Sequence, residues 1–115
     1  MDLQLTTRER GDAVVVELVG ELDLEALPPL RSHLLPLADD GARLVLDLSG
    51  VRFLDCSTLG ALVGLCERAR ERGGRVRVVG LRPRQRAVVR FFGLEEVFGV
   101  AGTVAEALQG EFDPA

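Results

Sequence analysis

Hydrophobic residues form short runs or alternate with polar ones in three segments, and these predict β-strands. Residues 12–20 contain the β-branched run Val14-Val15-Val16, and residues 43–49 are mostly apolar. Residues 75–81 alternate Arg with Val, which is typical of a strand with one wetter face. We expect two further strands, one before residue 12 and one near residue 100.

A spacing of three to four residues between hydrophobic positions predicts four helices. The first begins near residues 26–28, because Pro28 and Pro29 cannot lie deep inside a helix, and it ends by Asp39-Asp40-Gly41. Its apolar stripe is Leu27, Leu30, Leu34 and Leu37. The other helices are expected at residues 57–72, 83–93 and 103–109, the last with a Thr103/Glu106 capping box.

Strands linked through helices imply parallel neighbours that are covered by helices on at least one face. We therefore predict an α/β fold, with a mixed, mostly parallel sheet of four to five strands covered by about four helices. The 115 residues suit a single domain with a core at about residues 12–109, and we expect the tail 110–115 to be flexible.

The composition argues against a membrane protein and against a nucleic-acid-binding protein. No apolar run is long enough to cross a membrane, and the acidic opening is unlike a signal peptide, so we expect a cytoplasmic protein that does not contact membranes. With no Trp or Tyr and a formal charge of −4, direct nucleic-acid binding is not expected. A monomer or weak dimer is expected.

The charge is distributed unevenly along the chain. Residues 67–90 hold 9 Arg and 2 acidic residues, whereas the segments before and after them are acidic. This basic segment is either a solvated surface rich in Arg or a docking surface for an acidic partner, and the sequence leaves both open.

Few residues are suited to catalysis or metal binding. His33 is the only histidine and is expected on the solvent side of the first helix. Cys56 and Cys66 lie about 15 Å apart by helical rise, too far for a disulfide, and Cys66 is expected in the core. We expect no catalytic residue, no metal and no cofactor.

The helix at residues 57–72 has two distinct sides. Its buried stripe is expected to be Leu59, Leu62, Val63, Cys66 and Ala69, while Gly60, Gly64, Arg68 and Glu71 lie on the side of Ser57. Each helical glycine costs about 1 kcal/mol relative to alanine. Either a partner approaches closely over Gly60 and Gly64, or a loop of the same chain packs there.

The start of this helix carries three side chains that accept hydrogen bonds, Asp55, Ser57 and Thr58. One cap is sufficient, and Asp55 can supply it, which leaves Ser57 or Thr58 to face outward. A phosphate on either would be tolerated, because unpaired N–H groups and the positive end of the helix dipole favour an anion.

Three short motifs of the sequence resemble those of a known family. The pattern from Val14 to Leu108 is similar to a STAS domain, of the small freestanding kind that act as anti-sigma factor antagonists, also called anti-anti-sigma factors. The resemblance rests on Gly20-Glu21-Leu22-Asp23, on Asp47-Leu48-Ser49-Gly50-Val51, and on Asp55-Cys56-Ser57-Thr58-Leu59-Gly60. Two residues depart from the family motif: Cys56 replaces a serine and Thr58 replaces a glycine.

The resemblance implies a switch controlled by phosphorylation. Ser57 matches the serine that a partner kinase phosphorylates, with Thr58 as the alternative acceptor, and Asp23 matches an acidic residue beside it. The expected partners are an anti-sigma factor serine kinase, which the unphosphorylated form binds so that a sigma factor is released, and a serine phosphatase. The residues expected to bind the partner are Asp23, Asp55, Cys56, Ser57, Thr58, Gly60, Ala61, Gly64 and Arg68.

One other function remains open from the resemblance. Some STAS domains are subunits that do not switch, either in a signalling scaffold or as the accessory protein of a lipid-transporting ABC system. An enzyme is disfavoured, because no Gly-rich phosphate loop follows the first strand and no Lys accompanies Gly60 and Gly64.

Overall fold

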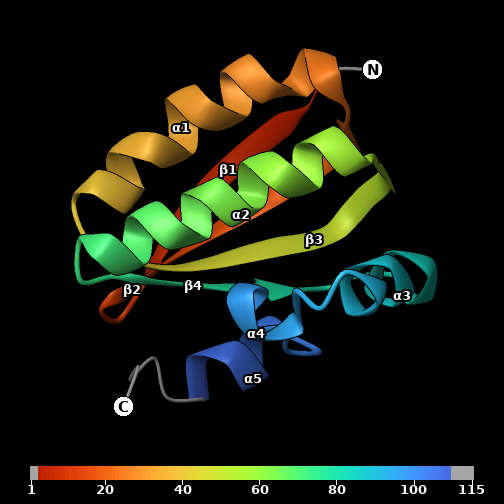
Figure 1. The fold of residues 1–115 in the computed structure, drawn as a ribbon. Coiled ribbons are helices and arrows are strands. Elements are labelled where there is room, and N and C mark those ends of the chain that lie inside the picture. The colour runs from red at the N-terminus through yellow and green to blue at the C-terminus, as the bar shows by residue number, and fades with distance from the viewer. Residues whose placement is uncertain (1–2, 110–115) are drawn as a thin grey trace.

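The computed structural model describes residues 3–109, and its centre is a four-stranded sheet in the order β1-β2-β3-β4 (Figure 1). The strands are β1 (Gln4–Arg10), β2 (Ala13–Leu22), β3 (Arg43–Leu54) and β4 (Arg75–Val79). β1 pairs antiparallel with β2, and the other two pairs are parallel. The carboxyl ends of β2, β3 and β4 therefore share one edge of the sheet.

The helices lie on both faces of this sheet. They are the 3₁₀ helix η1 (Leu24–Ala26), α1 (Leu27–Asp39), α2 (Cys56–Glu71), α3 (Pro83–Phe91), α4 (Glu95–Phe98) and α5 (Val104–Gln109). α1 and α2 lie side by side over one face (Figure 1). α5 packs on the opposite face against β3 and β4.

Side-chain alternation along the strands divides the interior into two apolar clusters. Leu44 and Leu46 of β3 face the large cluster under α1 and α2, and Val45 between them faces a smaller cluster. The smaller cluster consists of Ala13, Val15, Val45, Val79 and Ala107. β3 is thus buried on both faces, as its nearly continuous apolar run indicates.

The predicted fold class is confirmed, with differences at the ends of elements. The first helix begins at Leu27, within the expected window, and the Thr103/Glu106 capping box forms. The expected strand near residue 100 is wrong, because α4 occupies residues 95–98 and only Ala101 makes a single bridge to Val79. The expected flexible tail, 110–115, lies outside the described residues.

Three side-chain placements also differ from expectation. In α1, Leu37 is only partly buried, and Ala38 takes its place in the core. In α2, Val63 is only partly buried, and Leu65 takes its place in the core. His33 is half-buried, and its Nε2 lies 2.6 Å from Thr7 Oγ1 on β1, so it links α1 to the edge strand.

The segment Asp47-Leu48-Ser49-Gly50 shapes the sheet just before the site. Asp47 Oδ1 accepts a hydrogen bond from the Ser49 N–H at 3.0 Å. The register of β2 and β3 shifts here, and a Cβ on Gly50 would lie 2.9 Å from the Val19 side chain. Only glycine lets the strands approach so closely, which gives this motif a structural role.

Candidate functional site

Asp55 caps the start of α2. Its backbone is extended, and its Oδ1 accepts a hydrogen bond from the Thr58 N–H at 2.9 Å, as predicted for the cap. Its own N–H donates to the Leu22 carbonyl at the end of β2, at 3.1 Å. The first turn of α2 is therefore attached to the carboxyl end of the neighbouring strand.

Ser57 lies on the exposed side of this turn. Its hydroxyl donates to Asp55 Oδ1 at 2.8 Å. The side chain is exposed, so the hydroxyl is both accessible and held by a carboxylate. This is the arrangement that the helical wheel predicted for one of the two hydroxyl residues.

Thr58, by contrast, is fully buried, with 0% of its surface exposed. Its Oγ1 lies 2.9 Å from the Leu22 carbonyl and 2.8 Å from Asp55 Oδ1, so one hydroxyl proton is shared between two acceptors. The sequence left open whether Ser57 or Thr58 faces outward, and the structure places the Thr58 side chain in the interior. The Thr58 side chain does not reach the surface where a partner would contact it.

These contacts determine the ionisation of Asp55. The backbone N–H of Thr58, then its hydroxyl, and more weakly Ser57, hold the pKa of the Asp55 carboxyl below its ordinary value of 3.8. At neutral pH the group is a carboxylate and a weak base. It can orient the Ser57 hydroxyl but is poorly suited to remove its proton.

Asp23 lies at the same edge of the sheet, directly after Leu22. It caps η1, and its Oδ1 accepts a hydrogen bond from the Ala26 N–H at 3.2 Å. Because the Leu22 carbonyl binds both Asp55 and Thr58, the segment that carries Asp23 is joined to the first turn of α2. Asp23 is half-buried, so part of its carboxyl side chain reaches the surface.

Gly60 and Gly64 form an open strip along α2. Both are exposed, and a Cβ built on either would meet nothing within 4 Å. Packing beneath a loop of the same chain, the structural explanation that the sequence left open, is therefore wrong for both glycines. Ala61 beside them is half-buried.

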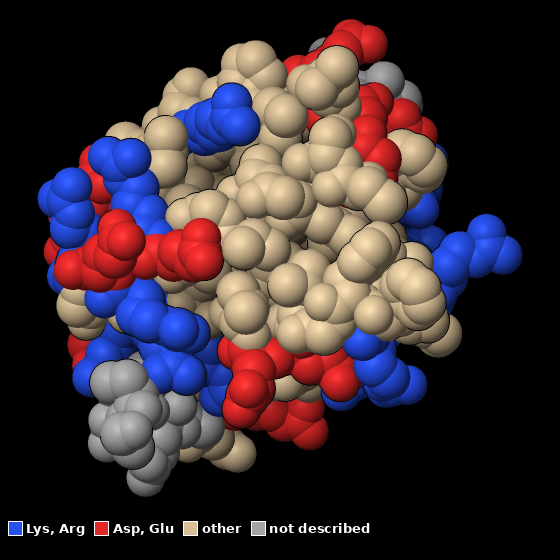
Figure 2. All heavy atoms as spheres, in the orientation of Figure 1, with Lys and Arg blue, Asp and Glu red and all other residues tan. Residues whose placement is uncertain are grey.

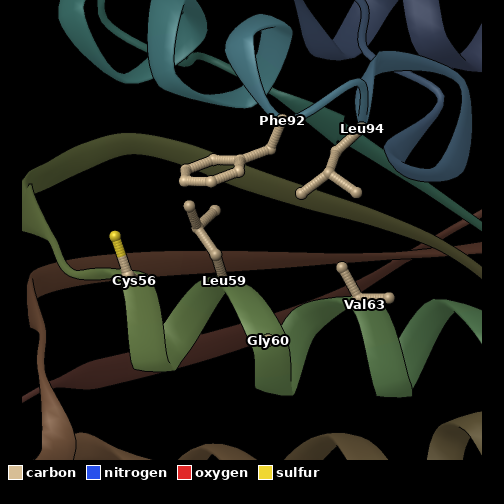
Figure 3. A pocket seen from close by; sticks show the side chains of 6 residues that line it. All are labelled: Cys56, Leu59, Gly60, Val63, Phe92 and Leu94. Atoms are coloured by element: carbon tan, nitrogen blue, oxygen red, sulfur yellow. The ribbon is translucent and has the colours of Figure 1, made fainter.

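An apolar groove runs beside this strip. It has a volume of about 320 Å³ and is lined by Cys56, Leu59, Gly60, Val63, Phe92 and Leu94. Figure 3 shows Phe92 and Leu94 reaching from the segment after α3 toward α2. Phe92 is 53% exposed and its neighbour Phe91 83%, and their rings meet edge to face at 5.3 Å between centroids.

Sequence reasoning missed Phe92 and Leu94 as part of the site. The usable signal was the pair Phe91-Phe92 directly before Gly93, because two adjacent aromatic residues at a helix end cannot both face the core. Figure 2 shows that the middle of this face, over α2, is mostly uncharged, with charged side chains around its rim.

Arg68, at the far end of the strip, forms an ion pair with another residue of the same chain. It donates to both carboxylate oxygens of Asp39 on α1, with Nη2 3.0 Å from Oδ2. Other arginines of the basic segment also have internal contacts: Arg77 donates to the Gly99 and Ala107 carbonyls, and Arg90 lies 3.6 Å from Glu95. Part of the basic segment is thus structural.

The two cysteines differ in reactivity. Both are free thiols, with Cys56 exposed in the groove and Cys66 buried. Burial raises the pKa of the Cys66 thiol to about 12.

Within residues 3–109, no group of three or more His, Cys, Asp or Glu residues is placed to hold a metal ion. No helix in this range is long and apolar enough to cross a membrane.

Comparison with known proteins agrees with this geometry. The anti-sigma-B factor antagonist of Bacillus subtilis (strain 168) is 28% identical over 101 residues, which cover 88% of this chain and 93% of that one. An anti-sigma factor antagonist from Mycobacterium paratuberculosis superposes with a TM-score of 0.83 at 28% identity, covering 93% and 92% of the two chains.

A further solved structure is of the Bacillus cell fate determinant SpoIIAA in its phosphorylated form. It has a TM-score of 0.70 at 28% identity, and covers 93% of this chain and 96% of its own. The profile of the STAS domain matches residues 4–107. The chain therefore belongs to the STAS domain family.

Proposed function

We propose that this chain is an anti-sigma factor antagonist that acts by partner switching. Its unphosphorylated form binds an anti-sigma factor serine kinase, a sigma factor is released, and phosphorylation of Ser57 ends the binding. The observation that carries the proposal is the exposed Ser57 hydroxyl, held by Asp55 beside an open and mostly uncharged face of α2. The descriptions of its relatives support it.

Ser57 is favoured over Thr58 as the acceptor because of access. A kinase must place the reacting hydroxyl in line with the terminal phosphate of its nucleotide. Ser57 is exposed, whereas the Thr58 hydroxyl is buried beneath the end of β2 and bonded to the Leu22 carbonyl. Phosphorylating Thr58 would require the first turn of α2 to leave the sheet.

A phosphate on Ser57 would oppose binding through charge and size. It adds about −1.5 to −2 charges, and it does so next to the carboxylate of Asp55. A partner that covers Gly60 and the groove would have to desolvate this charge or move away. A penalty of about 3–4 kcal/mol weakens binding some hundred- to thousandfold.

The fold itself accommodates the modification. Ser57 lies in the first turn of a 16-residue helix, where the dipole and unpaired N–H groups favour an anion. A relative solved in its phosphorylated form has the same fold, which supports a switch that needs no refolding. The kinase would supply nucleotide and Mg²⁺, and a serine phosphatase would restore the hydroxyl, so this chain acts as ligand and substrate.

The test begins with capture of the partner. The immobilised unphosphorylated protein is exposed to lysate of the source cells, and bound proteins are identified by mass spectrometry. We expect a serine kinase of the anti-sigma type. With ATP, that kinase should add one phosphate to the wild type and none to Ser57→Ala, which should still bind it tightly.

The matched control is Ser32→Ala. Ser32 is also an exposed helical serine, and its hydroxyl donates to the Pro28 carbonyl at 2.8 Å, but it lies on α1. This variant should be phosphorylated like the wild type. Phosphate that persists in Ser57→Ala and disappears in Thr58→Ala would contradict the assignment. Capture of ABC transporter subunits without any phosphorylation would favour the non-switching role.

A further inference from the structure

Asp55 Oδ1 accepts hydrogen bonds from three donors. The Thr58 N–H lies at 2.9 Å, the Thr58 hydroxyl at 2.8 Å and the Ser57 hydroxyl at 2.8 Å. Two of the three contacts come from one buried residue. The Thr58 hydroxyl also reaches the Leu22 carbonyl at 2.9 Å, so the same residue connects this oxygen to the end of β2.

We propose that Thr58 is the positioning residue for the Ser57 hydroxyl, acting through Asp55 Oδ1. This inference rests on the proposed function and adds to it a residue that is not itself modified. A line of contacts runs from the Leu22 carbonyl through Thr58 Oγ1 and Asp55 Oδ1 to Ser57 Oγ. Leu22 and Thr58 at its inner end are fully buried, and its exposed end is the Ser57 hydroxyl that is to receive the phosphate.

The need for such a support follows from exposure. An exposed serine side chain exchanges among three staggered rotamers, and only an acceptor with a fixed position selects one of them. Asp55 is itself partly exposed and would turn without a second anchor. Thr58, fully buried, supplies that anchor with a hydroxyl as well as with its backbone N–H.

The backbone contact alone holds Asp55 only as a helix cap. Many helices have that single contact without presenting a nucleophile. The Thr58 hydroxyl adds a second contact to Oδ1, and the same hydroxyl also contacts the Leu22 carbonyl at the end of β2. Removal of the hydroxyl should therefore loosen Ser57 and leave the cap in place.

The experiment compares Thr58→Val, which replaces the hydroxyl with a methyl group, with Thr58→Ser, which keeps it. Thr7→Val is the matched control, because Thr7 lies on β1, away from the site, and its hydroxyl contacts His33 of α1. Three-bond couplings report the Ser57 χ1 rotamer in the free protein, and ¹³C NMR reports the titration of the Asp55 carboxyl. Steady-state phosphorylation uses the captured kinase and ATP.

In Thr58→Val we expect the Ser57 χ1 couplings to become averaged and the pKa of Asp55 to rise toward its ordinary value. With the kinase, kcat should fall about tenfold while KM changes less than about twofold. Thr58→Ser should restore all three readouts, and Thr7→Val should match the wild type. All assays are run well below the unfolding midpoint of each variant, so a loss of stability alone moves none of them.

A Thr58→Val variant with a single Ser57 rotamer and an unchanged Asp55 titration would overturn the inference. So would an unchanged kcat when the wild type is phosphorylated on Ser57. The proposed function fails separately, if wild-type protein accepts no phosphate or if Ser57→Ala accepts as much. The NMR readouts need no kinase, and they decide the positioning role in either case.

Discussion

Arg68 of α2 and Asp39 of α1 form a two-pronged ion pair across the junction of the two helices that cover the sheet. The hydrogen bond with Arg68, more than charge alone, lowers the pKa of the Asp39 carboxyl, and the same bond raises that of Arg68. Arg68 was expected to bind the partner. Since its guanidinium is already bound to Asp39, a partner that uses it must compete with this pair.

This pair should show a salt-sensitive coupling in a double-mutant cycle of Arg68→Ala and Asp39→Ala, measured by urea unfolding. Both side chains are exposed, so the coupling should be small at low salt and vanish in 1 M NaCl, where the Debye length is about 3 Å. Because the folded pKa of Asp39 is lowered, the coupling should be present above its ordinary pKa of 3.8 and be lost as the pH falls through the folded value. A coupling that persists in 1 M NaCl would contradict this view.

Asp55 should behave as a charged helix cap. Asp55→Ala should lower the free energy of unfolding by about 1 kcal/mol, whereas Asp55→Asn, which keeps a side-chain oxygen, should cost less. The folded pKa of Asp55 is lowered, so its charge stabilises the protein above the ordinary value of 3.8 and ceases to do so as the pH falls through the lower folded value.

The difference in stability between the wild type and Asp55→Asn should therefore shrink over that acidic range, as measured by thermal unfolding at a series of pH values. A difference that stayed constant would mean that the Asp55 charge contributes nothing to the cap.

Gly60→Ala and Gly64→Ala should each stabilise the fold while weakening partner binding. A Cβ at either position meets nothing, so the gain in helix propensity is realised in full, about 1 kcal/mol or some 4 °C in Tm for each. The affinity for the captured kinase, measured by calorimetry, should fall, because each added methyl group occupies space on the strip that the partner approaches. Glu67→Ala, exposed on another side of α2, is the control. Stabilisation with unchanged affinity would place the partner elsewhere.

One thiol for each chain should react rapidly with a disulfide reagent such as DTNB at pH 8. Cys56 is exposed, whereas Cys66 is buried and its pKa is about 12, so almost none of it is thiolate. Cys56→Ser should abolish the rapid reaction, and the second thiol should appear only when denaturant unfolds the chain. Two rapid thiols in the native protein would contradict the burial of Cys66.

Local patterns were sufficient to predict the principal strands and helices. Pro28 and Pro29 limit where α1 begins, and the β-branched and leucine-rich runs indicate β2 and β3. The expected strand near residue 100 failed because its apolar residues are divided between α4 and one bridge at Ala101. A short apolar segment is compatible with either a strand or a helix, and tertiary contacts decide which of the two forms.

The sequence predicted the part of the site that lies on α2 alone. It did not predict the contacts that α2 makes with other elements. A helical wheel places Ser57, Gly60 and Gly64 on one side of α2 correctly. It cannot show that Thr58 is bonded to the end of β2, nor that Phe92 lies opposite Leu59 across a groove. Those residues lie more than 30 positions apart in the sequence, beyond any local spacing rule.

The sheet separates the two apolar clusters of this molecule, so a substitution in one cluster lies on the other side of the strands from the second. Ala107 and Val79 pack on the face opposite α1 and α2, with the strands between them and the Ser57 turn. Substitutions at distant positions without shared partners act independently on stability. The α5 side can therefore be redesigned, or diverge among homologues, while the contacts that orient Ser57 stay as they are.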